Sequence, residues 1–199
     1  MLETGHRAVS KGLARKAVKV LDLRPTALPL PSPTGGSTSS GGCDSYAHLA
    51  ALGYPGFAYL RTKAARRNPA GLLLEALNES NLDVRVAEGL PWLALTYVDM
   101  DWDWLVRNAK VSDIQNRLGF AVALASEVAK NKNDSDRAQK LGGCLEALER
   151  ARLAREDTFC HDSMTQAERL WVREHRSSTA SHWNLLTDME ARHLAYARA

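Results

Sequence analysis

Apolar residues recur every three or four positions along most of the chain after residue 43, and this spacing predicts successive amphipathic helices. Asn68-Pro69 has the order of an N-cap followed by a first-turn proline, and Thr165 is placed to cap a later helix. Period-two alternation is confined to short pieces such as 95–98, so the sequence predicts an all-α fold. The predicted helices cover 44–52, 57–67, 69–77, 82–90, 101–109, 113–128, 141–153, 165–171 and 181–196.

Helix boundaries follow from polar caps and breakers at the ends of these segments. Gly53 is placed to end the first helix, and Pro91 is predicted to interrupt the helix over 82–90. Further N-caps are predicted at Asp44 or Ser45, Asn81, Asp99 or Asp101, Asp113, and Ser181 or His182.

Residues 25–43 differ in composition from the rest of the chain. Four prolines are followed by a run rich in Gly and Ser, which favours extended and then flexible backbone. We therefore expect a flexible linker at 25–43 between an N-terminal segment, residues 1–24, and a multi-helix domain, residues 44–199.

Composition is that of an ordinary globular protein, with 45% hydrophobic residues and a formal charge of +3. The three cysteines stand at wide, irregular spacing, which indicates a reducing compartment rather than a disulfide framework. We expect no signal peptide, because no apolar run follows the basic N-terminus, and no run approaches the roughly 18 to 20 apolar residues of a membrane span. The predicted location is cytoplasmic, without membrane contact.

The N-terminal segment carries the only family resemblance. Leu2-Glu3-Thr4-Gly5 precedes a short polar loop, Ser10 as N-cap, and a helical pattern over 11–23. Residues 2–30 resemble the second half of the helix-turn-helix domain of XRE/Cro-type transcriptional regulators. The resemblance implies a recognition helix upstream of Met1 and later helices that pack behind it. One face of the predicted helix carries Leu13, Ala17, Val20 and Leu21.

Basic residues gather on the remaining faces of this segment and favour weak, sequence-independent contact with DNA. Phosphate contacts position a protein on DNA but do not read its sequence. A second basic cluster follows the linker within 61–67. The predicted phosphate-contacting residues are Arg7, Lys11, Arg15, Lys16 and Lys19.

Two tryptophans on the predicted helix over 101–109 suggest a protein-binding surface. Trp102 and Trp104 lie about 200 degrees apart on a helix, so they face different ways. We expect Trp104 to pack in the core and Trp102 to be exposed, as an anchor for a protein partner or a second copy of the chain.

Catalytic and metal-binding patterns are incomplete. Asp99, Asp101 and Asp103 match the start of a calcium loop, but Trp104 stands where that loop needs glycine and Lys110 where it needs Glu, so helix capping is favoured. Cys160-His161 lacks a nucleophile signature, and the Gly pairs within 35–42 lack the flanking strand and helix of a phosphate loop. We predict no catalytic residue, no metal and no cofactor, hence no enzyme.

The sequence thus favours an XRE-like transcriptional regulator whose helical domain mediates sensing, dimerisation or partner binding. The alternative is a helical protein–protein interaction or antitoxin-like protein that never contacts DNA. An enzyme built on Cys160 and the nearby histidines is the third and weakest reading, because no triad or metal set accompanies the thiol.

Overall fold

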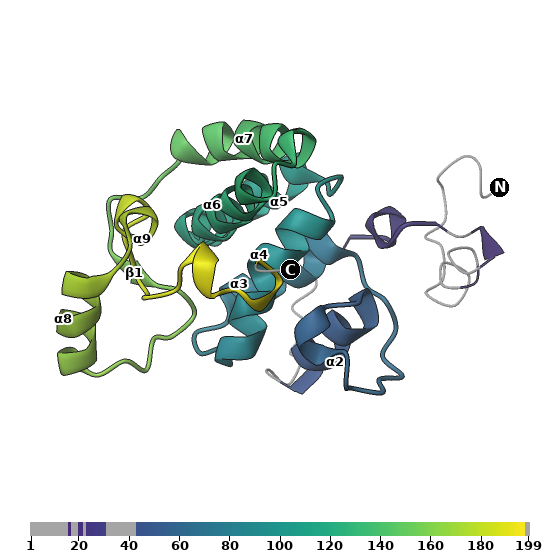
Figure 1. Ribbon diagram of the computed structural model, residues 1–199, viewed down its shortest axis with the longest axis horizontal. Coiled ribbons are helices and arrows are strands. Elements are labelled where there is room, and N and C mark those ends of the chain that lie inside the picture. The colour runs from purple at the N-terminus through teal and green to yellow at the C-terminus, as the bar shows by residue number, and fades with distance from the viewer. Residues whose placement is uncertain (1–15, 17–19, 22, 31–42, 198–199) are drawn as a thin grey trace.

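The computed structural model describes residues 16, 20–21, 23–30 and 43–197. It is 62% helical, with two short strands, which confirms the all-α prediction. The helices and strands of this described part are α2 (Cys43–Leu52), α3 (Pro69–Asn78), α4 (Val84–Thr96), α5 (Trp102–Val111), α6 (Gln115–Asn131), α7 (Ser135–Glu149), β1 (Asp157–Thr158), α8 (Gln166–His175), α9 (Ser178–His182) and β2 (Leu185–Leu186) (Figure 1).

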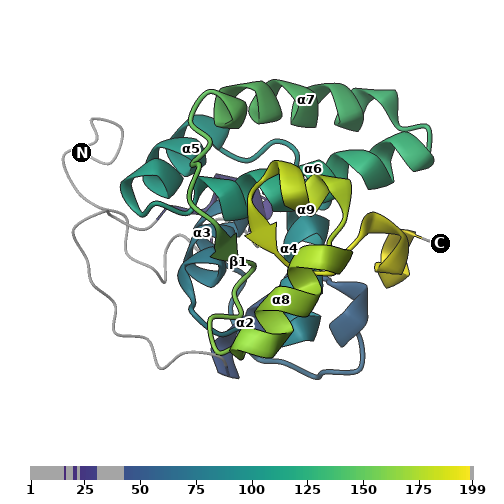
Figure 2. The same cartoon turned by 90° about the vertical axis from the view of Figure 1, so that its left-hand side faces the viewer.

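Helix α6 is the centre of the molecule. It contacts α3, α4, α5, α7, α9 and β2, and α7 lies alongside it in both views (Figures 1 and 2). Side chains at nearly every angle around α6 are buried, the polar Arg117 and Ser126 as well as the apolar Leu118, Phe120 and Leu124. A helix that is buried at nearly every angle needs neighbours on all sides, which matches its central place.

The tightest contact on α6 is at Gly119. A Cβ at this position would lie 2.3 Å from the ring of Trp183, which is itself buried. The missing side chain therefore lets the indole, which directly follows α9, lie across the α6 backbone.

Several predicted helix ends are confirmed. The side chain of Asn68 accepts the amide of Ala70 at the start of α3, and Asp101 accepts that of Trp104 at the start of α5. Thr165 and Glu168 form a reciprocal capping box on α8. Gly53 ends α2 with φ +95°, a value that favours glycine.

The predicted helix over 57–67 is wrong. After the turn at Pro55–Phe57 the chain runs without helix to Asn68, and its polar groups bond to α2 instead. The Arg66 guanidinium donates to the Ala51 carbonyl, and His48 contacts the carbonyl of Ala65. Pro69 disfavours helical backbone in the residue before it, so this segment approaches α3 extended.

The predicted break at Pro91 is also wrong. Asp83, not Asn81, caps α4, and the helix continues through the buried Pro91. Asn81 is used elsewhere, because its side chain accepts the amide of Ser163. Burial of one complete face of α4 offsets the hydrogen bond that a proline lacks.

Other boundaries move for local reasons. Asp113 has φ +56° and lies ahead of α6, whose N-cap is Ile114, and α2 begins at Cys43, so Asp44 and Ser45 lie inside it. The predicted helix over 181–196 is wrong as well. Helix α9 ends at His182, and Asn184, with φ +53°, turns the chain into β2.

The first part of the predicted linker lies on the helical domain. Leu28 is buried, and the Asn68 amide donates to the carbonyls of Thr26 and Leu28. Arg24 pairs with Asp99 at 3.3 Å. Residues 31–42, the Gly/Ser-rich remainder, lie outside the described residues.

Within the predicted DNA-contacting segment, Lys16 is helical and exposed. Val20 and Leu21 are exposed as well. Arg7, Lys11, Arg15 and Lys19 lie outside the described residues, so their contact with phosphates stays a prediction.

The predicted contrast between Trp102 and Trp104 is wrong, since both side chains are half-buried and pack against the core. The Trp102 indole donates to the Val98 carbonyl at 3.0 Å. Its role in partner binding stays a prediction. The exposed indole of the described region is Trp171 on α8, at 54%.

No helix in the described ranges combines the length and the apolar character that crossing a membrane requires.

Candidate functional site: a pocket beside helix α4

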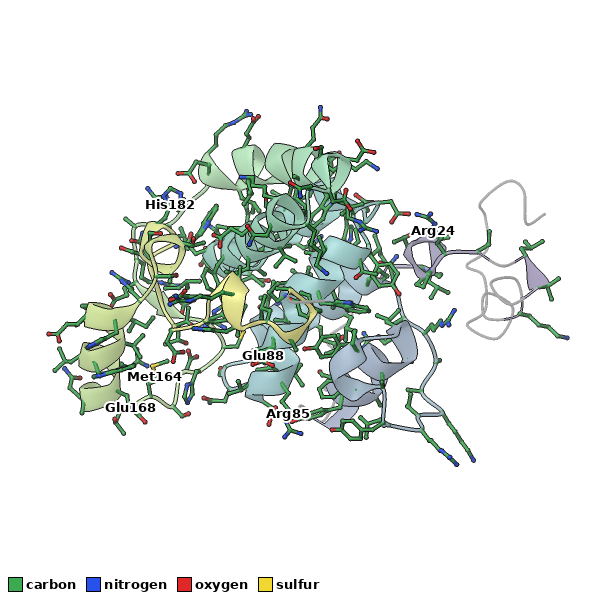
Figure 3. All side chains as sticks on the ribbon, in the orientation of Figure 1. Arg24, Arg85, Glu88, Met164, Glu168 and His182 are labelled. Carbon is green, nitrogen blue, oxygen red and sulfur yellow. The ribbon has the colours of Figure 1, made fainter. Side chains whose placement is uncertain are left out.

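A pocket of about 290 Å³ lies between the N-terminal half of α4 and two later segments of the chain. Three stretches line it: 82–88 at the start of α4, 159–164 after β1, and 186–194 from β2 onward. Figure 3 labels Glu88 and Met164, which belong to two of these walls. We call this cavity the α4 pocket.

A buried arginine of α6 holds the wall at 159–164 in place. Arg117 is 8% exposed and binds Asp157 through two parallel hydrogen bonds of 2.7 and 2.9 Å. It also donates to Asp162 at 3.3 Å and to the carbonyls of Leu77 and Glu79. All five guanidinium N–H groups thus have acceptors. We call this set the Arg117 cluster.

The charges of the cluster stabilise one another. Burial lowers the pKa of Arg117, but its hydrogen bonds and ion pairs with Asp157 and Asp162 outweigh this and raise the pKa. Burial likewise raises the pKa of Asp157, and Arg117 more than reverses that effect. Both groups are therefore charged at neutral pH. Arg117 is thus the side-chain ion-pair partner of both Asp157 and Asp162.

Backbone pairing joins the same wall to the start of α4. Asn81 and His161 form an antiparallel bridge, and the amide of Leu82 donates to the carbonyl of Cys160 at 2.8 Å. The amide of Asp162 donates to Ser80 in the same way. Two walls of the pocket therefore meet along a short ladder.

The third wall is held by β2 and by the C-terminal turns. Leu185 and Leu186 pair in parallel with Asp157 and Thr158 of β1. Further on, the buried Tyr196 donates its hydroxyl to the Glu88 carbonyl on α4. The chain from β2 to Tyr196 thus closes the pocket against α4.

Apart from the hydroxyl of Thr187 and the thiol of Cys160, the polar side chains that line the pocket are carboxylates and imidazoles. Glu88 and Asp188 contribute carboxylates, and His161 and His193 contribute imidazoles. Glu88 is half-buried, and no side chain in the described part of the protein pairs with it. Burial, with the negative charge of Glu88 as a second cause, raises the pKa of Tyr54 to about 12. Burial also raises the pKa of Tyr196, with smaller contributions from Tyr54 and then Glu88.

Cys160 lines the pocket but is unsuited to nucleophilic chemistry. Its side chain is 1% exposed and faces the carbonyls of Ala76 and Leu77. Burial raises the pKa of its thiol to about 12, so the reactive thiolate is scarce at neutral pH. Across the described residues, no group of His, Cys, Asp and Glu is arranged to hold a metal ion.

Only two of the residues predicted from sequence as sites lie in the described part of the chain, and they do not meet here. Neither Lys16 nor Trp102 lines the α4 pocket. Sequence reasoning missed Glu88, although one signal marks it: it is the single charged residue in the apolar stretch 86–96. Asp188 and His193 carried no such signal, because only the fold of the C-terminal turns brings them to α4.

A second surface feature lies on α8. Leu170 and Trp171 are 49% and 54% exposed, and the Trp171 indole stacks on His175 with ring centroids 4.4 Å apart. Arg173 and Arg176, at the C-terminal end of the helix, both pair with Glu156. The exposed surface of α8 thus carries an apolar pair, Leu170 and Trp171, beside polar and charged side chains.

Comparison with protein-family models, with curated proteins and with solved structures gave no significant match. The resemblance of residues 2–30 to XRE/Cro-type regulators thus stays a prediction from the sequence.

Proposed function

We propose that the protein is a regulator of XRE-like descent whose helical domain is a sensor that binds a small organic ligand in the α4 pocket. The observation that carries the proposal is Glu88, a half-buried carboxylate without a partner among the described residues, in the wall of a cavity lined mostly by apolar groups. Concave, largely apolar pockets with a few convergent polar groups are the usual form of small-molecule sites.

The arrangement also suits a sensor because distant parts of the chain build the pocket. A ligand between α4 and the segment 186–194 would stabilise the contact of the C-terminal turns with the first half of the domain. Binding to the folded state alone raises its stability by mass action.

A fragment screen by thermal unfolding tests the sensor. Val84 is 64% exposed at the edge of the pocket, so Val84→Trp should obstruct the cavity without disturbing the core. Val111→Trp, at an 81% exposed position on α5, is the matched control. We expect compounds that raise Tm of the native chain and of the Val111 variant but not of the Val84 variant. Shifts that all persist in the Val84 variant, or the absence of any shift, would contradict the proposal.

DNA binding by the N-terminal segment completes the proposed regulator. Its support is the density of basic residues in 1–24 and the exposure of Lys16. Fluorescence anisotropy with a duplex of arbitrary sequence should show weak affinity that falls steeply with salt, because each neutralised phosphate releases counterions.

Matched triple variants test which lysines contribute. Changing Lys11, Lys16 and Lys19 to Gln should lower the slope of log affinity against log salt by about 2 to 3. Changing the exposed Lys130, Lys132 and Lys140 should leave the slope unchanged. Equal effects of both triples, or a discrete footprint at physiological salt, would overturn non-specific binding through this segment.

The second candidate is a helical interaction protein without DNA binding, favoured by the exposed Leu170 and Trp171 on α8. We propose a second copy of the chain as the occupant, since a two-fold contact needs only one such patch on each copy. Sedimentation should show concentration-dependent dimers that Trp171→Ala dissociates. A native chain that stays monomeric at high concentration would exclude this role.

A further inference from the structure

The acidic side chains that line the α4 pocket have the opposite sign to the net charge of the whole chain. The protein has 26 Lys and Arg and a formal charge of +3, yet none of the described residues that line this pocket is Lys or Arg. Two acidic side chains, Glu88 and Asp188, are among the lining residues. We infer that the α4 pocket takes a small organic cation, an ammonium group on an apolar body. This inference rests on the proposed sensor function and specifies its ligand.

The two carboxylates lie at different depths. Glu88 is half-buried on α4, and Asp188 is exposed on the opposite segment after β2. A carboxylate that is partly removed from water without a partner has lost hydration and gained nothing in return. An ammonium group beside Glu88 would supply charge-assisted hydrogen bonds, the strongest kind such an acceptor forms. Asp188 would add attraction at the rim.

The apolar walls fit the body of such a ligand. Phe159 is 4% exposed and is held edge-to-face against Phe120 of α6, with ring centroids 5.0 Å apart. Met164 and Met189 contribute flexible, polarisable thioethers, which adapt to an irregular apolar shape. The cavity volume of about 290 Å³ lies at the lower end of the range for ligand sites, which limits the ligand to a small molecule.

A metal ion is the other cation that such groups could attract. Carboxylate and imidazole ligands must converge on one point to hold it. The described His, Cys, Asp and Glu residues form no such group. The pocket therefore favours a cation that brings its own apolar surface.

Calorimetric titration with three probes of equal size tests the inference. Phenethylammonium, phenethyl alcohol and phenylacetate share an aromatic body and differ in charge. The chain should bind phenethylammonium at least about ten-fold more tightly than the alcohol, since one charge-assisted hydrogen bond is worth about that factor. Phenylacetate should bind most weakly of the three.

Two variants connect this preference to the pocket. Glu88→Gln keeps the size of the side chain and should remove most of the preference for the cation while leaving the alcohol unaffected. Glu146→Gln, on the exposed surface of α7, should change nothing. Equal binding of the three probes, or a preference that survives Glu88→Gln, overturns the cationic class.

The outcomes separate the inference from the proposed function. If the alcohol or phenylacetate binds best and Val84→Trp abolishes that binding, the pocket is a ligand site but the cationic class is wrong. If the cation preference is present and Val84→Trp leaves it unchanged, the cation binds elsewhere and the inference is also wrong. If no probe binds and the fragment screen gives no shift, both the sensor and its cationic ligand are excluded.

Discussion

The Arg117 cluster and the α4 pocket share one stretch of chain, 157–164, but treat charge in opposite ways. In the cluster, every N–H of a buried arginine has an acceptor, and both carboxylates face that arginine. In the pocket, which residues 159–164 of this stretch also line, the carboxylates of Glu88 and Asp188 have no partner among the described side chains.

The difference indicates which charges hold the fold and which are available to a ligand. A satisfied buried network rigidifies the segments that it joins, here α3, α6 and the loop after β1. An unpaired carboxylate contributes nothing to that frame and loses hydration by being half-buried. Such a carboxylate lowers the stability of the fold slightly, which is common for groups at binding sites.

Removal of Arg117 should have the largest effect. Arg117→Met keeps an apolar stem but leaves Asp157 and two carbonyls without their donor, so unfolding free energy should fall by about 3 to 5 kcal/mol. Urea denaturation measures this. Arg173→Met, which breaks the exposed pair with Glu156, is the control and should have a much smaller effect, because exposed ion pairs contribute little to stability. Similar losses in the two variants would contradict the structural role of the cluster.

Gly119→Ala should have the next largest effect and should reach the pocket through its third wall. The added methyl group would meet the Trp183 ring at 2.3 Å, and Trp183 precedes β2 by two residues. We expect a loss of about 1 to 3 kcal/mol from overpacking. Gly142→Ala on α7, where a new Cβ meets nothing within 4 Å, should instead be neutral or slightly stabilising.

Acid should weaken the cluster in a defined pH range. The pKa of Asp157 is lower in the folded chain than in the unfolded one, where it is about 3.9. Its contribution is therefore fully present above about pH 4 and is lost as the pH falls through the lower folded value. Urea midpoints measured across this range should fall more steeply for the native chain than for Asp157→Asn. Parallel curves would show that Asp157 is not the titrating group.

Neutralising the pocket should have the smallest effect on stability. Glu88→Gln and Asp188→Asn should change the unfolding free energy by no more than about 0.5 kcal/mol, since neither removes a paired charge. The same denaturation measurements check this. A loss comparable with that of Arg117→Met would mean that Glu88 supports the fold and is not free for a ligand.

Local signals in the sequence predicted those elements whose ends carry their own caps. Asn68-Pro69, Asp101 and Thr165 each satisfy amides within three residues, so no distant contact is needed to place α3, α5 and α8. The apolar residues of α6, which recur every three or four positions, likewise predicted a long helix. For these elements, period and cap chemistry were sufficient.

Tertiary contacts decided the rest. The helix α4 continues through Pro91 because burial of the helix outweighs one lost hydrogen bond. Residues 60–68 are not helical, and Ala65 and Arg66 hydrogen-bond with α2 instead. The prediction that Trp104 is buried and Trp102 exposed was wrong for the same reason. Helical periodicity gives the angle between the two side chains, but not how much of each is covered by neighbouring segments.

What the sequence determined by itself was the all-α class, the central amphipathic helices and the basic character of the N-terminal segment, because these depend on spacing and composition within a few turns. The α4 pocket and the Arg117 cluster were decided only in three dimensions. Their members lie as far apart as Leu77 and Asp162, or Glu88 and Asp188, and neither spacing nor composition records such a distance. The sequence identifies the charged side chains, but only the fold determines which of them form ion pairs and which are available to bind a ligand.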